Sequence, residues 1–206
     1  RLIIGGLDRV YEISKDFRNE GIDRNHNPEF TMLEFYEAYS DLNDMIVMTE
    51  ALFKKISKDL NQKVFTFNGH KIDISKKFKI ISMKQLFVDY VGINLIEISD
   101  LELKKIAKKN DIDSKKYNHR GKIIEKIFSQ LVEPNLIQPT FVIDYPVDIS
   151  PLARYKRDDS SKLYVERFEL FIAGVEIANS FSEINDSFEQ KDRLLKQQEL
   201  LNKGDN

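Results

Sequence analysis

The 206-residue chain is long enough for one domain with a sizeable core and too short for two large ones. Its hydrophobic content of 41% and charged content of 32% are typical of a soluble globular protein, and its net charge of −2 argues against a generally basic nucleic-acid-binding surface. The absence of cysteine excludes disulfides and cysteine-ligated zinc and favours the cytoplasm. No apolar run is long enough to span a bilayer, so no membrane partner is expected. Because the sequence opens inside an apparent strand without a methionine, we expect a piece of a longer protein.

The first 41 residues are predicted to form two strands joined by a long loop. Apolar and polar residues alternate over 10–13 and again over 30–36, as in strands with one buried face. The polar stretch 18–29 contains glycine and proline and suits the loop of a hairpin. One set of alternate side chains on the two strands is expected to face the core: Tyr11, Ile13, Phe17, Leu33 and Phe35.

A helix and a second hairpin are expected next. Asp41 or Asn43 is suited to cap the helix, which carries apolar residues at helical spacing. Two short β-like runs, 64–67 and 71–74, then flank Asn68-Gly69, a dipeptide typical of tight hairpin turns.

Three further helices are predicted, at about 83–91, after a cap at Ser99, and over about 119–132. This lysine-rich part, about 75–135, is interpreted as a largely helical insertion whose charges form a solvated surface. The last helix is expected to bury one apolar face, made by Ile123, Ile124, Ile127, Phe128, Leu131 and Val132.

Strands return in the last part of the chain, at 139–144, 162–173 and 175–183, with Gly174 at a turn. A charged helix is expected from Asp186 onward. Strands, then helices, then strands again indicate an α+β fold with a mainly antiparallel sheet. The apolar stripe of the terminal helix is predicted to consist of Leu194, Leu195, Leu200 and Leu201.

Chemically useful side chains are expected on one face of the first hairpin. On the returning strand Phe30, Met32, Glu34 and Tyr36 share a face, and Arg18 lies at the loop end of the other strand. An aromatic ring, a thioether, a carboxylate and a phenol beside an arginine suit a flat aromatic ligand together with a charged one.

Three carboxylates in apolar strands form a second candidate site: Glu169, Glu176 and Glu183. A buried, unpaired carboxylate is costly, so each should meet a cation or a metal ion. For a single glutamate, a salt bridge on an edge strand is the simpler explanation. Three of them within residues 169–183 favour a site.

Ordered segments of the sequence resemble the catalytic domain of the class II lysyl-tRNA synthetases. Residues 17–21 (Phe-Arg-Asn-Glu-Gly) and 26–31 (His-Asn-Pro-Glu-Phe-Thr) resemble the second motif of that family. Residues 148–153 (Asp-Ile-Ser-Pro-Leu-Ala) resemble another of its segments, and 167–171 with 176–183 resemble its metal- and lysine-binding strands. The resemblance covers nearly the whole chain. The related aspartate and asparagine enzymes share the arginine and the Pro-Glu-Phe sequence but not the His-Asn or Ser-Pro-Leu-Ala segments.

The resemblance implies a class II synthetase fold with flanking helices and an activity as a lysine–tRNA ligase. Lysine and ATP would form lysyl-adenylate with Mg²⁺, and the lysyl group would pass to the 3′ end of tRNA(Lys). The full-length protein is expected to be a cytoplasmic homodimer. Most of the first motif, the third motif and the anticodon-binding domain are expected to lie outside residues 1–206, so this piece alone should be inactive.

The same resemblance assigns roles to single residues. Arg18 and Glu20 would be catalytic, with Arg18 holding the α-phosphate and the lysine carboxylate. The residues that would bind ATP are Arg18, Glu20, His26, Asn27 and Phe30, with Phe30 stacked on adenine. The metal ligands would be Glu169 and Glu176. The residues that would bind lysine are Glu34, Tyr36, Asn179, Phe181 and Glu183, with Glu183 on the ε-ammonium group. His26 is equally suited to stabilise its loop, and Glu34 to make a structural hydrogen bond.

The implied pocket conflicts with a regular strand. If 173–174 form a tight turn, Glu169 and Glu176 share a face, whereas positions 179–183 point the other way. We therefore predict a β-bulge within residues 176–180 that brings both sets and Arg18 to one cavity.

Three other functions remain open from the sequence. A relative of these synthetases that attaches lysine to a protein, such as an elongation factor, would share the same motifs. A non-catalytic regulatory relative would be expected to have lost charged site residues, and none of them is missing here. A purely structural α+β domain is disfavoured by the ordered motifs.

Overall fold

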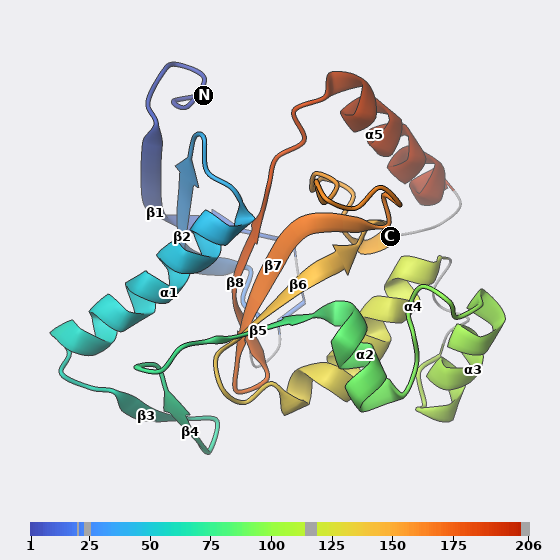
Figure 1. Ribbon diagram of the computed structural model, residues 1–206, viewed down its shortest axis with the longest axis horizontal. Helices are drawn as coiled ribbons and strands as arrows, with labels where there is room; N and C mark the ends of the chain where they lie inside the picture. The colour runs from blue at the N-terminus through green and yellow to red at the C-terminus, as the bar shows by residue number, and fades with distance from the viewer. Residues whose placement is uncertain (20, 23–25, 114–118, 203–206) are drawn as a thin grey trace. The chain divides into compact units, whose positions relative to one another are not determined.

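The structure is a computed structural model that describes residues 1–19, 21–22, 26–113 and 119–202 (Figure 1). The chain divides into two compact units, Arg1–Asp41 and Leu42–Asn206, and each is described by itself. Among the described residues, no helix combines the length and the apolar character needed to cross a membrane.

The first unit is a β-hairpin. Strand β1 (Arg9–Phe17) pairs antiparallel with β2 (Glu29–Glu37), and the pairing continues past the strand ends, where the Arg18 amide donates to the Pro28 carbonyl over 2.9 Å. The predicted pair of strands and the loop between them are confirmed.

The predicted core side of this hairpin is wrong in the structure. Tyr11, Ile13 and Phe17 are 76%, 69% and 73% exposed, and Leu33 is exposed as well, while Phe35 is half-buried. Alternation identified the apolar face correctly, because these residues share one side of the ladder. A two-stranded ribbon has no second layer of its own with which to cover that face.

The second unit begins with a long helix and a small hairpin. Helix α1 (Leu42–Asp59) starts directly after Asp41, and strands β3 (Val64–Phe67) and β4 (His70–Asp73) follow. The turn between the strands, Asn68-Gly69, has φ values of 48° and 79°, the left-handed pair that a two-residue turn requires. The prediction from this dipeptide is confirmed.

A four-stranded sheet forms the centre of the second unit, in the order β5-β6-β7-β8. Strands β6 (Thr140–Pro146), β7 (Tyr164–Ile172) and β8 (Val175–Phe181) are antiparallel, whereas β5 (Lys79–Ser82) runs parallel to β6. The mainly antiparallel α+β fold is thus confirmed. The short strand β5 was not predicted, because four residues are too few to show a reliable alternation.

The predicted middle helices are present. They are α2 (Met83–Val91), α3 (Asp100–Lys109) and α4 (Arg120–Ile127), and α4 continues as the π-helix η2 (Phe128–Val132) and the short helix η3 (Glu133–Asn135). The last predicted helix therefore changes its winding part-way. Its apolar face is buried as expected at Ile123, Ile124, Ile127, Phe128 and Val132, and partly buried at Leu131.

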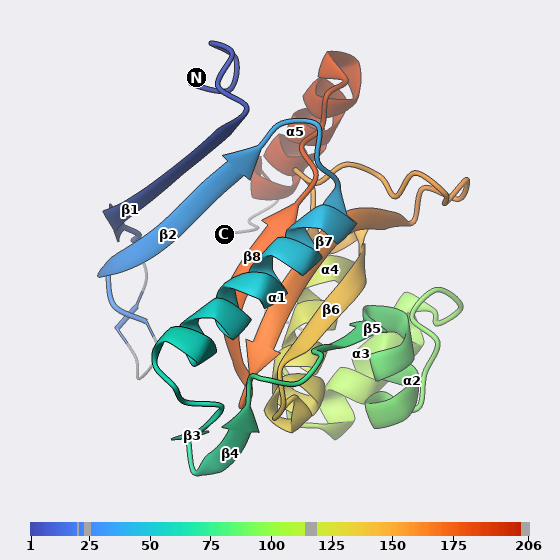
Figure 2. The same ribbon diagram turned by 60° about the vertical axis from the view of Figure 1, so that its left-hand side comes forward.

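Side chains from alternate positions of β7 enter two different cores. Phe168 and Leu170 pack in a core with Ile46 of α1, and Figure 2 shows α1 lying across β7 and β8. Val165 and Phe171 point to the opposite face and pack with the helices α2 to α4. These helices share that core with the sheet, and their interpretation as an insertion at about 75–135 stays a prediction.

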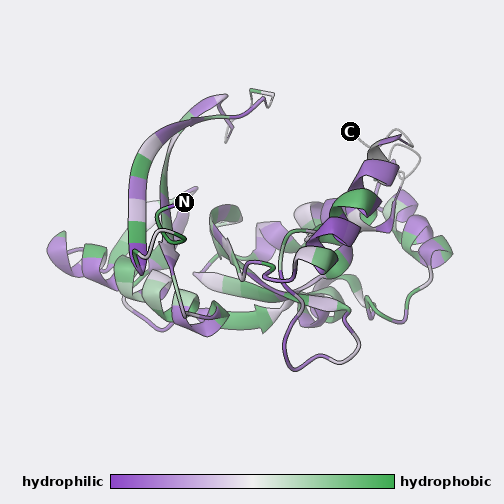
Figure 3. Cartoon of the chain, turned by 90° about the horizontal axis from the view of Figure 1, so that it is seen from above, coloured by the Kyte–Doolittle hydropathy of each residue, from purple (hydrophilic) through white to green (hydrophobic). Residues whose placement is uncertain are grey.

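The terminal helix α5 (Ser187–Asn202) follows a cap in which the Asp186 carboxylate accepts from the amides of Phe188 and Glu189, over 2.9 and 3.2 Å. Hydrophilic residues predominate along it (Figure 3). The predicted leucine stripe is not buried where it is described, since Leu194 and Leu195 are 48% and 54% exposed. The side chains of Leu200 and Leu201 lie outside the described residues.

Gly121 at the start of α4 provides a test of this packing. A Cβ atom built there would lie 2.6 Å from the Asp148 carbonyl oxygen and 2.9 Å from the His119 ring, which caps the helix. We expect Gly121→Ala to lower the free energy of unfolding by about 1–3 kcal/mol, the usual cost of an overpacked site. Urea unfolding would measure this loss. Lys126→Ala, on the exposed side of the same helix, should leave stability nearly unchanged, and equal effects of the two would contradict the close approach.

Candidate active site

A β-bulge in β8 determines which side chains line the candidate site. Ala173 and Gly174 form the turn before it, with φ values of 51° and 71°. The register then places Phe171 opposite Glu176, but Leu170 opposite Ala178, so that Ile177 is the extra residue. The irregularity predicted within residues 176–180 is confirmed.

Beyond the bulge the two strands present their polar residues on one face. Glu169 lies opposite Asn179, and Arg167 lies opposite Phe181. Opposite residues of an antiparallel pair share a face, so Glu169, Glu176, Asn179 and Phe181 all point to the same side. This is the side covered by the helices α2 to α4, since Phe171 packs among them.

Glu169 is the most buried of the three predicted carboxylates and is 8% exposed. One of its oxygens accepts from the Arg167 guanidinium, and the other accepts from the Tyr145 hydroxyl over 2.7 Å. The Arg167 guanidinium also lies 4.8 Å from the centre of the Tyr145 ring. Burial, and after it the neighbouring Glu169 charge, raises the pKa of Tyr145 well above its usual value, so this phenol keeps its proton. Glu169 therefore meets a cation, as predicted.

A cavity of about 170 Å³ opens above this network. Apolar side chains of α2, η2 and β7 contribute to its walls, including Met83 and Phe128. Of the polar residues in the lining, the sequence predicted only Glu169 and Glu176. The helical pattern does not distinguish a glutamate that faces the sheet from one that faces solvent. The polar side chains around the cavity are Glu125, Glu133, Tyr145, Arg167, Glu169 and Glu176.

Arg167 also fastens the segment 148–153 to the sheet. Its guanidinium donates to the Ile149 carbonyl over 3.0 Å, to the Ser150 hydroxyl over 2.7 Å and to the Asn179 side-chain oxygen over 3.2 Å. The planar group with five donors can serve all these acceptors and the Glu169 carboxylate at once. Two of the sequence segments singled out above are thereby joined through one side chain.

The prediction that Glu183 faces the same cavity as Glu176 is not confirmed. Glu183 does not line the cavity, and its backbone forms an isolated antiparallel bridge with Ala153. The residue as a whole is exposed, yet surrounding protein partly desolvates its carboxyl group, which raises the pKa of Glu183 above the usual glutamate value.

The hairpin of the first unit presents its predicted polar face as expected. Phe30 lies opposite Asp16 and Glu34 opposite Glu12, so the residues predicted to face a ligand share one side of the ladder. Tyr36 belongs to that side as well and is exposed.

The loop end of the hairpin holds the residues expected to bind ATP. The Arg18 guanidinium lies 5.2 Å from the centre of the Phe30 ring, and the Asn27 side chain donates to the Glu29 carbonyl over 2.9 Å. His26 is exposed, and Glu20 lies outside the described residues. Whether Arg18 reaches the cavity of the second unit stays a prediction.

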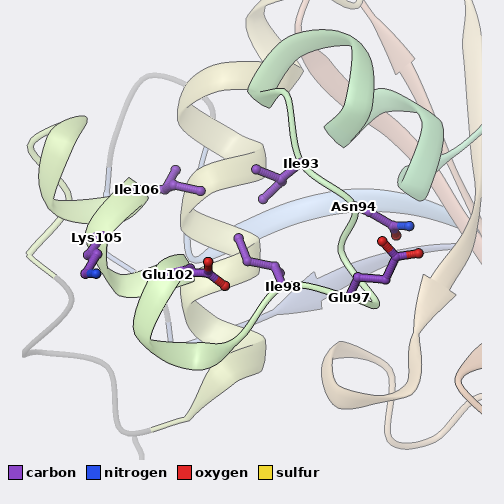
Figure 4. Close-up of a pocket in the computed structure, with 7 residues that line it drawn as sticks. All are labelled: Ile93, Asn94, Glu97, Ile98, Glu102, Lys105 and Ile106. Carbon is purple, nitrogen blue, oxygen red and sulfur yellow. The ribbon is translucent and has the colours of Figure 1, made fainter.

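A larger hollow of about 520 Å³ lies elsewhere, beside α3 (Figure 4). Three isoleucines and a few polar groups line it, and the Glu102 carboxylate there already serves the capping box with Ser99. This hollow lacks the convergent ionised groups of the smaller cavity, so we place the candidate site at β7 and β8. The lining residues are Ile93, Asn94, Glu97, Ile98, Glu102, Lys105 and Ile106.

The carboxylates at the smaller cavity fit a magnesium ion that is shared with a ligand. Each carboxylate oxygen has a second lone pair, so Glu169 keeps acceptor capacity beyond Arg167 and Tyr145. Within the described ranges there is no group of three or more His, Cys, Asp or Glu that could enclose a metal ion. Magnesium is usually held by one or two carboxylates together with substrate phosphates, and Glu169 with Glu176 supplies that number.

Comparison with known proteins identifies the family. Residues 1–205 match the family described as "tRNA synthetases class II (D, K and N)". The chain belongs to this family. The class II synthetase fold expected from the sequence motifs is thus shown, and the strands β7 and β8 described here are strands of a class II synthetase catalytic domain.

Several curated proteins named "Lysine--tRNA ligase" resemble this chain along all or nearly all of its length. The protein of Thermoanaerobacter sp. (strain X514) is 46% identical over 207 residues, which cover 100% of this chain and 41% of the relative. Those of Wigglesworthia glossinidia brevipalpis and Prochlorococcus marinus (strain MIT 9301) are 49% and 47% identical over 200 and 209 residues, covering 96% and 100% of this chain and 40% of each relative. The chain spans about two fifths of the length of these relatives.

The buried pair at the base of the site provides a graded stability test. Arg167→Met leaves the Glu169 carboxylate buried without its cation, and we expect a loss of about 3 kcal/mol in the free energy of unfolding. Tyr145→Phe removes one hydrogen bond to the same carboxylate and should cost about 1–2 kcal/mol. Chemical denaturation would rank the two variants.

A surface ion pair serves as the control for this test. Lys15 and Glu29 are 2.9 Å apart with side chains that are 70% and 47% exposed, so Lys15→Met should cost less than about 1 kcal/mol. The reverse order, with Tyr145→Phe the most damaging, would show that Arg167 does not neutralise Glu169.

Proposed function

We propose that the complete protein is a lysine–tRNA ligase that uses ATP to activate lysine and transfers it to tRNA(Lys). The observation that carries this proposal is the β8 bulge, which puts Glu169, Glu176 and Asn179 on one face, in a chain whose relatives are named lysine–tRNA ligases. The retained charged residues also favour an enzyme over a non-catalytic relative.

The reaction needs no nucleophile from the protein. A carboxylate oxygen of lysine attacks the α-phosphorus of ATP, and the bond between that phosphorus and the oxygen bridging to the β-phosphate breaks. Lysyl-adenylate and pyrophosphate result. In the second step a ribose hydroxyl at the 3′ end of tRNA attacks the lysyl carbonyl, and AMP leaves. The protein therefore has to orient reactants and stabilise charge on the phosphates.

The carboxylates of β7 and β8 would hold Mg²⁺ against the ATP phosphates. The ion would supply positive charge that neutralises the phosphates as pyrophosphate departs. Glu169 suits this role because it forms an ion pair with Arg167 and the hydrogen bond from Tyr145 fixes its orientation. Glu176 lines the same cavity from the neighbouring strand.

Five residues are proposed to bind lysine. Glu183 would accept hydrogen bonds from the ε-ammonium group, because a carboxylate at this position gives charge complementarity that an amide would not. Asn179 and Phe181 share the face of Glu169 and would contact the rest of the amino acid. The family resemblance also assigns Glu34 and Tyr36 of the hairpin to lysine binding.

ATP would be held mainly by the first hairpin. Arg18 would bind the α-phosphate and the lysine carboxylate through its planar guanidinium, with Glu20 beside it. Phe30 would stack on adenine, and His26 and Asn27 would line the nucleotide site from the loop. In the structure Arg18 rests near the Phe30 ring, so both side chains already lie at one end of the ribbon.

We further propose that the whole protein acts in the cytoplasm as a homodimer and carries an anticodon-binding domain. These features are those expected of a complete class II lysine enzyme, of which residues 1–206 would be one part of the catalytic domain.

Selectivity for lysine is the first test. In the complete protein, Glu183→Gln should lower kcat/KM for lysine by about tenfold to a hundredfold, because a charge-assisted hydrogen bond contributes about 1.5–3 kcal/mol. Lysine-dependent exchange between ATP and pyrophosphate would measure this, and the KM for ATP should stay unchanged. Glu97→Gln, on the exposed hollow beside α3, is the matched control. An unaltered kcat/KM for lysine would remove Glu183 from the pocket.

The acid limb of the pH profile is the second test. Lysine should bind the ionised form of Glu183, whose pKa is raised by partial desolvation. As pH falls through that raised pKa the carboxyl gains a proton, so kcat/KM for lysine should begin to fall at a higher pH than an ordinary glutamate would give. The profile should lose this limb in Glu183→Gln. An identical limb in the variant would assign the titration to another group.

A further inference from the structure

The terminal helix carries a buried arginine that has no role in the proposed catalysis and does not belong to the predicted apolar stripe. Arg193 of α5 is 6% exposed. Its guanidinium donates to the Ala153 carbonyl over 2.7 Å and lies within 3.4 Å and 3.5 Å of the Pro151 and Ser150 carbonyl oxygens. Three backbone acceptors of one turn thus converge on a single side chain.

The remaining contacts of Arg193 hold it in that place. Glu189, one helical turn earlier, forms an ion pair with it, and the guanidinium lies 4.0 Å from the centre of the Tyr155 ring. The two terminal nitrogens of this guanidinium donate to carbonyls and a carboxylate, whereas the buried Nε has no hydrogen-bond partner among the described residues. Burying an arginine costs free energy unless its charge and most of its donors are satisfied, so these contacts give Arg193 a structural role and not that of a surface charge.

The turn that Arg193 contacts is also contacted by Arg167. Arg167 holds the Ile149 carbonyl and the Ser150 hydroxyl and also pairs with Glu169 in the cavity. Two guanidinium groups, one from β7 and one from α5, therefore hold the segment 149–153.

This turn is joined directly to the backbone of Glu183. Ala153 and Glu183 form an antiparallel bridge, and the Arg154 amide donates to the Ser182 carbonyl over 2.9 Å. Glu183 is also linked along the chain to α5, whose cap is Asp186. Both ends of the segment 183–193 are therefore attached to this turn, one through the backbone of Glu183 and the other through the Arg193 side chain.

We propose that Arg193 is a positioning residue for lysine recognition, acting on Glu183 through the turn 150–153. This inference rests on the proposed function, in which Glu183 binds the ε-ammonium group. The ammonium–carboxylate contact depends on placement to within a fraction of an ångström, so a loosened turn weakens it without touching the nucleotide. Lysine at position 193 would keep the charge but lose the planar set of donors and the stacking on Tyr155.

The test uses the full-length protein with Arg193→Met, Arg193→Lys and the control Lys196→Met, which removes an exposed cation from the same helix. In lysine-dependent exchange between ATP and pyrophosphate, Arg193→Met should raise the KM for lysine about tenfold, as is usual for residues that orient a binding group, with the KM for ATP unchanged. Arg193→Lys should give an intermediate value, and Lys196→Met should match the wild type. Discrimination between lysine and norleucine, which lacks the ε-ammonium group, should shrink in the same order.

Amide hydrogen exchange supplies a readout that does not depend on activity. The amides of Arg154 and Ser182, which form the ladder beside Glu183, should exchange faster in Arg193→Met than in Lys196→Met. If Arg193→Met does not fold, the same two measurements on Arg193→Lys decide the matter.

Two results would overturn the inference while leaving the proposed function intact: an unchanged KM for lysine, or equal increases in the KM values for lysine and ATP. If the wild-type protein shows no lysine-dependent exchange, the proposed function fails. The exchange rates of Arg154 and Ser182 then still report whether Arg193 holds the turn.

Discussion

The ion pair between Arg167 and Glu169 is the interaction on which the rest of the site depends. A carboxylate buried beneath a helical layer has to be neutralised, and Arg167 does this while it also binds the backbone at Ile149 and the side chain of Asn179. The same guanidinium therefore sets the charge of the cavity and the position of two neighbouring segments. A lysine could neutralise the charge, but one ammonium group could not satisfy acceptors on three sides in a plane.

Alternation in strands and the needs of a binding site oppose each other in β8, and the bulge resolves the conflict. A regular ladder sends Glu176 and Asn179 to opposite faces, because their spacing is odd. Ile177 adds one residue without a partner, so the strand keeps its hydrogen bonds on both sides of the irregularity.

Periodicity in the sequence was sufficient to predict most helices and strands but not the side-chain contacts that hold them together. The Asn68-Gly69 turn and the face of α4 could be predicted, because each follows from local stereochemistry. The β8 bulge could be predicted only because the pocket implied by the family resemblance conflicts with a regular strand. Strand β5 was missed because a four-residue run of lysine, isoleucine and serine carries no clear pattern. The terminal helix was predicted to bury leucines, yet its described buried anchor is an arginine whose partners lie some 40 positions earlier in the chain. Contacts of that kind are set by tertiary structure and leave no periodic signal.

Because of the bulge, the number of residues in β8 affects the site independently of the chemistry of their side chains. The face to which each side chain after Ile177 points depends on the presence of one additional residue and not on the identity of that residue. Replacing its side chain would alter only local packing. Removing it would rotate the whole remainder of the strand to the opposite face, carrying Asn179 and Phe181 away from Glu169 together. The number of residues in this strand therefore determines which side chains face the site. Deleting one codon would reverse that facing, whereas replacing the side chain of Ile177 would not.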